Sequence, residues 1–159
     1  MGLFRVSGTI VAIGQSEFNN KGTLYAFIEI LEPNGRRVIV CNVGMLNQVA
    51  SSITLGTNGE FFFDKFFVYG RPFVSQLWGV KSAAGLVSFD NDMRKHAMGL
   101  SFLVGALTIP LLGVGFLFIA LGLLQLLFVI IRAGARKRMF FGNNRAEARR
   151  LRQQLPVRI

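Results

Sequence analysis

The sequence is poor in the residues that most often carry enzyme chemistry. Its 159 residues include one cysteine, Cys41, and one histidine, His96. One of each cannot form a usual His/Cys zinc site, and a lone cysteine cannot close a disulfide within the chain. The phosphate-binding patterns GxxxxGK[ST] and GxGxxG are also absent. We therefore expect a protein that is not an enzyme and that holds no metal or cofactor.

Acidic residues are scarce in only one half of the chain. Up to Asp90 there are seven basic residues and six acidic ones, whereas after Asp90 eleven basic residues face only Asp92 and Glu147. Most of the formal net charge of +10 therefore belongs to the C-terminal part. Such an asymmetry predicts an anionic neighbour, either a membrane surface or a nucleic acid.

The first ninety residues carry the pattern of β-strands. The runs are rich in β-branched and aromatic residues, and an Asn34-Gly35 dipeptide predicts a tight hairpin turn between two of them. In the second run Leu24, Ala26 and Ile28 share one face by alternation. We expect strands at 3–14, 22–31, 37–43, 60–68 and 74–83, the last extended or paired by 85–89, with one or two helical turns within 44–52.

This order of five strands, with a short helix between the third and the fourth, resembles the OB-fold, a small Greek-key β-barrel. Gly8, within the first strand, suits the sharply bent opening strand of that fold. The resemblance covers residues 1–89 and rests on the order of elements, not on a motif. An SH3-like barrel or another small β-barrel stays open at this stage.

A stretch without any charge follows the β region. Residues 97–131, 35 in number, would form a single helix about 52 Å long, whereas the hydrocarbon core of a membrane is about 30 Å thick. Basic residues flank the stretch at 94–96 and at 132–138, and the positive-inside rule keeps both flanks in the cytoplasm only if the chain turns round. We therefore predict a membrane helical hairpin with its turn at Pro110, Gly113 and Gly115, in preference to a single crossing.

Small and polar residues within the uncharged stretch predict close helix packing. Small side chains let two backbones approach, and an amide in an apolar helix favours a hydrogen bond across a helix interface. These residues either hold the hairpin closed or form an oligomer interface: Ala97, Ser101, Gly105, Gly115, Gly122 and Gln125.

The segment 132–159 is rich in arginine and is predicted to contain an amphipathic helix near 144–155. Basic residues just inside a membrane are attracted to anionic lipid. An acidic protein surface or a nucleic acid is the alternative partner. The residues concerned are Arg132, Arg136, Lys137, Arg138, Arg145, Arg149, Arg150 and Arg152.

Aromatic residues are concentrated between residues 61 and 73. Alternation places Phe61 and Phe63 inside the barrel and leaves Phe62, Phe67 and Tyr69 as candidate partner-binding aromatics. Exposed aromatics could stack on single-stranded nucleic acid, but a region with almost no net charge lacks the usual electrostatic attraction. Contact with another protein, or with the membrane hairpin, is the favoured interpretation.

Together these features predict a cytoplasmic OB-like barrel at 1–90, a basic linker at 91–96, a membrane hairpin at 97–131 and a basic cytoplasmic tail at 132–159. The expected function is that of a membrane-anchored interaction or assembly subunit, which recruits protein partners and forms a homo- or hetero-oligomer. A chain with no signal peptide pattern at its start and no disulfide fits the bacterial inner membrane. The alternatives are an oligomerising, pore-forming protein regulated by its barrel and a membrane-tethered nucleic-acid binder.

Overall fold

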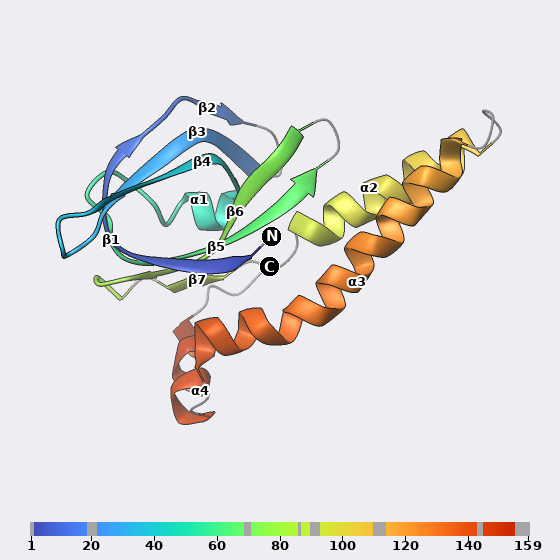
Figure 1. Cartoon of the computed structure of the whole chain (residues 1–159). Helices are drawn as coiled ribbons and strands as arrows, with labels where there is room; N and C mark the ends of the chain where they lie inside the picture. The colour runs from blue at the N-terminus through green and yellow to red at the C-terminus, as the bar shows by residue number, and fades with distance from the viewer. Residues whose placement is uncertain are drawn as a thin grey trace. The chain divides into compact units, whose positions relative to one another are not determined.

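The computed structural model describes residues 2–18, 22–68, 71–85, 87–89, 93–109, 114–142 and 145–154. The chain divides into two compact units. One consists of Met1–Asp90 together with Phe140–Ile159, and the other of Asn91–Met139. Figure 1 shows the strands of the first unit and the long helices.

The described part of the first ninety residues folds into strands and one short helix in the predicted order, with one addition: Ser16–Phe18, between the first two expected strands, forms a short strand that was not predicted. The 85–89 segment contributes a separate short strand that pairs with the strand before it. The elements are β1 (Leu3–Ile13), β2 (Ser16–Phe18), β3 (Gly22–Leu31), β4 (Arg37–Leu46), α1 (Asn47–Ala50), β5 (Asn58–Val68), β6 (Arg71–Ser82) and β7 (Val87–Phe89).

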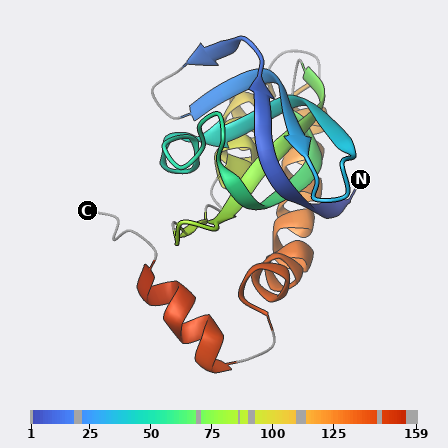
Figure 2. The same cartoon turned by 90° about the vertical axis from the view of Figure 1, so that its left-hand side faces the viewer.

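Five of these strands close into a barrel, in the ring β1–β5–β6–β4–β3–β1. All neighbours in the ring are antiparallel except β4 and β6, which are parallel and pair Val43 with Ser75. Both the ring order and the single parallel pair are consistent with the small OB-like barrel that the sequence resembles. Figure 2 shows the same strands from a second direction, with α1 against the barrel.

Gly8 lies where β1 passes from one neighbour to another. Residues 3–9 of β1 pair with β5, and residues 9–13 pair with β3. A Cβ atom at Gly8 would overlap the carbonyl oxygen of Leu31, so only glycine permits this close approach. The predicted bend in the first strand is therefore the point at which β1 helps to close the barrel.

Along β3 and β4, the set of alternate positions whose side chains face the core changes at Asn42, a residue with a left-handed backbone conformation. Asn42 has a φ of 51°, and the buried positions of β4 shift from Val40 to Val43 across it. On the paired strand Ile28 is buried as expected, but Ala26 is exposed and Tyr25 packs against the core instead. The predicted alternation is therefore wrong at Ala26, because the core-facing positions change phase opposite Asn42 while the β3–β4 pairing register stays unbroken.

The helical segment predicted within 44–52 is present as α1, a single turn of four residues. Gly44 and Met45 pair with β3, so β4 runs on to Leu46 and the helix begins at Asn47. Val49 of this helix is fully buried. It joins the hydrophobic core of the barrel, which contains Val6, Ile10, Ile28, Ile30, Val40, Val43, Met45, Val49, Ile53, Phe61, Phe63, Leu77 and Val80.

Three helices follow the barrel: α2 (Met93–Thr108), α3 (Val114–Phe141) and α4 (Arg145–Gln154). α3 does not end with the apolar stretch at residue 131 but continues through the basic residues to Phe141. Arginine, lysine and alanine are good helix formers, so the change from apolar to basic residues does not end the helix. It ends where Gly142 takes a φ of 68°, the left-handed conformation common after a helix C-terminus. The helix expected near 144–155 corresponds to α4.

Candidate functional site

Five aromatic rings from distant parts of the chain meet in the first compact unit. This aromatic cluster consists of Phe62, Trp78 and Phe89 from β5, β6 and β7, with Phe140 and Phe141 from the end of α3. The ring centroid of Phe140 lies 5.1 Å from that of Phe62 and 5.1 Å from that of Phe89. The Phe141 ring lies 5.4 Å from Phe89. These separations and tilted geometries are those of favourable aromatic pairs.

Gly79 provides the space for Phe140. A Cβ atom at this position would lie 2.7 Å from the Phe140 ring, closer than real Cβ contacts. Two residues further along β6, the Lys81 ammonium lies 5.1 Å from the Phe140 centroid and 5.7 Å from the Phe62 centroid. Phe140 is thus fully buried between a glycine backbone, three barrel aromatics and a cation.

The expectation that Phe62 is available to a partner is wrong. Phe62 faces away from the core lined by Phe61 and Phe63, as predicted, but Phe140 of the same chain covers it completely. The Phe67 side chain and Tyr69 lie outside the described residues. Sequence reasoning did not identify Trp78, Phe89, Phe140 or Phe141. The available signal was an apolar "MFF" at 139–141, between a basic run and Gly142.

The second unit contains α2 packed against α3. A Cβ atom added at Gly105 would lie 2.8 Å from the Ile119 side chain, and one added at Gly122 would lie 3.1 Å from the Phe102 ring. A Cβ atom at Gly115 would overlap the carbonyl oxygen of Gly105. Gly105, Gly115 and Gly122, all predicted as packing residues, therefore lie at the contact between the helices. Residue numbers rise along α3 as they fall along α2, so the two helices are antiparallel.

The other predicted residues of this unit have different outcomes. Gly115 is not in the turn, because α3 begins at Val114, while Pro110 and Gly113 lie outside the described residues. Ser101 is buried, and the Ala97 side chain is not among those described. The Gln125 amide oxygen is buried without a hydrogen-bond partner among the described residues.

One described helix is long and apolar enough to cross a membrane. It spans Gly115–Phe141, its most apolar window has a mean hydropathy of 2.5, and only 6% of that window is buried. A core helix of a soluble protein would be mostly covered, whereas this helix exposes leucine, isoleucine and phenylalanine side chains along its length. The apolar part of α2, Met98–Thr108, is shorter.

Some of the predicted basic residues lie on the surface, whereas one is buried. Lys137, Arg138, Arg149 and Arg150 are exposed, and the Arg132 guanidinium lies 5.3 Å from the Phe128 ring centroid. Arg136 differs from expectation, because it is only 2% exposed. It precedes Phe140 by one helical turn, so both lie on the same face of α3 and both are buried. The Arg145 and Arg152 side chains lie outside those described.

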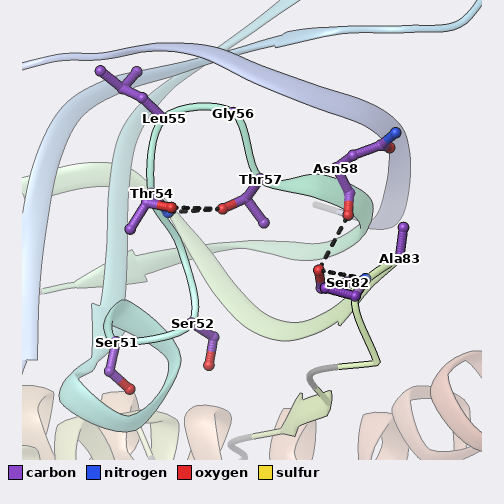
Figure 3. Close-up of a pocket in the computed structure, with 10 residues that line it drawn as sticks. Ser51, Ser52, Thr54, Leu55, Gly56, Thr57, Asn58, Ser82 and Ala83 are labelled. Carbon is purple, nitrogen blue, oxygen red and sulfur yellow. Dashed lines mark hydrogen bonds between the residues drawn. The ribbon is translucent and has the colours of Figure 1, made fainter.

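A recess of about 520 Å³ lies between the segment after α1 and the turn after β6 (Figure 3). Its hydroxyl groups are bonded within the loops: the Thr54 amide donates to Thr57 Oγ1 at 2.9 Å, and Ser82 Oγ donates to the Asn58 carbonyl at 3.3 Å. No charged residue is among those lining it, which are Ser51, Ser52, Thr54, Leu55, Gly56, Thr57, Asn58, Ser82, Ala83 and Ala84. Nothing in this recess resembles an acid–base or nucleophilic arrangement.

Comparison with known proteins gives no family or relative for this chain. No protein-family model matches it, and neither the curated proteins nor the solved structures contain a significant match. Within the described part of the chain, no group of three or more His, Cys, Asp or Glu residues is placed to hold a metal ion.

Proposed function

We propose that the protein is a non-enzymatic, membrane-anchored interaction subunit. In this proposal α2 and α3 form a hairpin that enters the membrane from one side and holds the OB-like barrel at that surface. The observation that carries the proposal is the aromatic cluster, because it joins residues that precede the apolar segment to residues that follow it.

The aromatic cluster favours a hairpin over a single crossing. If the apolar segment crossed once, Phe89 and Phe140 would lie on opposite sides of a hydrocarbon core about 30 Å thick. Their ring centroids are 5.1 Å apart. Opening the cluster to allow a single crossing would expose Phe140, Trp78 and Phe62, which are fully buried in the closed unit. The energetic loss of several buried aromatic side chains supports entry and exit on the same side.

The exposed basic residues supply the second part of the anchor. Lys137 and Arg138 follow the apolar part of α3, and Arg149 and Arg150 are exposed on α4. Each basic residue near an anionic leaflet contributes about 1 kcal/mol of attraction. By the positive-inside rule these residues favour a cytoplasmic location for both termini, and a bacterial inner membrane is the proposed location.

The barrel supplies the proposed contact with other protein subunits, as one component of a homo- or hetero-oligomer. Phe62 is covered by the chain itself, so the contact is assigned to other apolar side chains of the barrel. Phe18 on β2 is 75% exposed and Ile39 on β4 is 60% exposed. Large exposed apolar residues of this kind are the usual anchors of protein interfaces.

The two alternative functions have less support. A water-filled pore needs polar groups facing its lumen, but Thr108 Oγ1 donates to the Val104 carbonyl at 2.7 Å and Ser101 is buried. A base-stacking surface needs neighbouring accessible aromatic rings, and Phe62, the ring predicted for that role whose side chain is described, is fully buried.

The chain's single cysteine provides the test. Cys41 is exposed on the barrel, so a membrane-impermeant maleimide labels it only from the side on which the barrel lies. Gln153 is exposed on α4, and a Cys41→Ser/Gln153→Cys variant moves the label to the tail. In intact bacterial spheroplasts we expect neither cysteine to react until detergent is added.

The outcomes separate the parts of the proposal. Labelling of only one of the two cysteines in intact spheroplasts would place barrel and tail on opposite sides and overturn the hairpin. Labelling of both would keep the hairpin but reverse its orientation. The Cys41→Ser chain, which has no cysteine, gives the background of the assay.

A further inference from the structure

One edge of the barrel's sheet continues past its last partner strand. Residues 3–9 of β1 pair with β5, and the last backbone hydrogen bonds on that side join Ile10 to residues 56–57, each at 2.9 Å. From there to the end of β2, at residues 11–18, the chain pairs with β3 alone among the described residues. β2 lies at the margin of the barrel in both Figure 1 and Figure 2. We call residues 11–18 the free edge.

The free edge has few of the features that keep strand edges from pairing with other chains. Proteins commonly block an edge with lysine or proline. The free edge contains neither, and its one charged residue is Glu17. It also carries a large exposed apolar side chain at each end, because Val11 is 41% exposed and Phe18 is 75% exposed. Unpaired backbone groups between two exposed apolar side chains form a template for a further strand.

The order of side chains along the free edge fits a second copy of the same edge. If two copies pair antiparallel along the whole edge about a two-fold axis, residue 11 of each lies opposite residue 18 of the other. Phe18 of each copy then lies beside Val11 of the other, so both apolar ends are covered. Each Glu17 lies opposite Ala12 of the other copy, and the two carboxylates are about 17 Å apart along the strands. Pairing of the β2 strands alone about their centre would instead place these like charges directly opposite each other.

We propose that the free edge is a homodimer interface, in which residues 11–18 of two copies join the two barrels in one continuous sheet. This inference rests on the proposed function, which assigns Phe18 to contact with another subunit, and it identifies that subunit as a second copy of the chain. Anchoring of both copies in one membrane raises their effective concentration, so a short pair of strands is enough to hold them together.

Cysteine cross-linking in membranes tests both the partner and the register. A Val11→Cys chain and a Phe18→Cys chain, each with Cys41→Ser and a different tag, are produced in the same cells and mildly oxidised. Opposite Cα atoms in antiparallel strands are about 4.5–5.5 Å apart, which suits a disulfide. Two copies of residue 11, or two of residue 18, would be about 24 Å apart. We expect the mixed disulfide to exceed each same-variant disulfide at least about tenfold.

The other outcomes of this experiment have separate meanings. Same-variant disulfides as abundant as the mixed one would refute the two-fold pairing. A chain that stays in alkali-extracted membranes but forms no dimer, or cross-links to a different protein, would overturn the homodimer and leave the membrane-anchored subunit in place. Loss of the chain from extracted membranes would contradict the proposed anchoring, and the inference with it.

Energy transfer between labelled copies gives a second measurement without a disulfide. Full chains carrying a donor or an acceptor on Cys41, which is exposed, are combined in vesicles at a high ratio of lipid to protein. Phe18→Lys adds an edge-blocking lysine at an exposed position and should lower the transfer at least about fivefold. Ile39→Lys is the matched control, since Ile39 is 60% exposed on β4, outside the free edge, and it should leave the transfer unchanged. Absence of transfer in the unsubstituted chain, or equal effects of the two substitutions, would refute the interface.

Discussion

Replacing Phe140 by alanine tests the aromatic cluster, on which the proposed topology depends. Phe140 is fully buried, and four other rings and the Lys81 ammonium surround it. Truncation of a buried phenylalanine costs about 3–5 kcal/mol. Since small domains are stable by about 5–15 kcal/mol, this loss is large enough to release the end of α3 from the barrel.

Trp78 makes the release measurable. It is the only tryptophan of the chain, it is fully buried, and its ring centroid lies 6.0 Å from that of Phe140. In the full chain in detergent micelles, Phe140→Ala should move the Trp78 emission to longer wavelength and increase its quenching by acrylamide. The thermal midpoint should fall by roughly 12–40 °C, from about 3–5 kcal/mol and about 4–8 °C per kcal/mol for a domain of this size.

Two further variants make the result specific. Gly79→Ala acts from the barrel side of the cluster, because it adds a Cβ atom 2.7 Å from the Phe140 ring. It should give the same change in Trp78 emission as Phe140→Ala. Phe18→Ala removes a ring that is 75% exposed and should alter stability by no more than about 0.5 kcal/mol. If Phe140→Ala behaves like Phe18→Ala in emission, quenching and thermal midpoint, the end of α3 does not occupy the cluster and the reasoning is refuted.

Two other predictions concern the helices. Gly115→Ala should separate α2 from α3 and lower the midpoint of helix unfolding in sodium dodecyl sulfate, because the added Cβ atom would overlap the Gly105 carbonyl. Gly134 has open space around it, so Gly134→Ala should leave this midpoint unchanged. Equal effects of the two substitutions would contradict the packing of α2 against α3. A fluorophore on Gln153→Cys, in a chain with Cys41→Ser, should shift to shorter wavelength in anionic compared with zwitterionic vesicles. The double substitution Arg149→Gln/Arg150→Gln should remove about 2 kcal/mol of the attraction between α4 and anionic lipid, and high salt should abolish the wavelength shift. A shift that neither the substitutions nor salt reduces would exclude electrostatic attraction of α4 to lipid.

The barrel was predictable because its signals are local. Alternation and turn residues identify each strand, and Gly35 adopts the φ of 82° that its Asn-Gly turn requires. The order of elements then leaves few ways to close five strands. The left-handed conformation of Asn42 was not predictable, because no pattern in the neighbouring sequence marks such a residue.

The aromatic cluster depends on contacts that leave no local signal. Phe62 and Phe140 are separated by half the chain, and each lies in a sequence that also suits an exposed or membrane-facing position. Similarly, the end of α3 could not be placed from charge, because a helix continues through basic residues when their propensity is high. Comparing the length of the apolar stretch with the thickness of a membrane favoured two helices. It could not show that the second helix, which begins at Val114, contains more of the apolar stretch than the first.

The position of Phe140 also sets a sequence of events during synthesis. All five barrel strands are synthesised before α3, so Phe62, Trp78 and Phe89 await their covering residue while roughly 50 further residues are added. At roughly 5–20 residues per second this interval lasts roughly 3–10 s. Throughout it the nascent barrel presents an open aromatic surface, and only a chain whose apolar segment has turned back can close it. In the proposed topology, closure of the cluster marks the completion of insertion, and a chain that does not close it keeps an exposed aromatic surface of the kind that chaperones and proteases recognise.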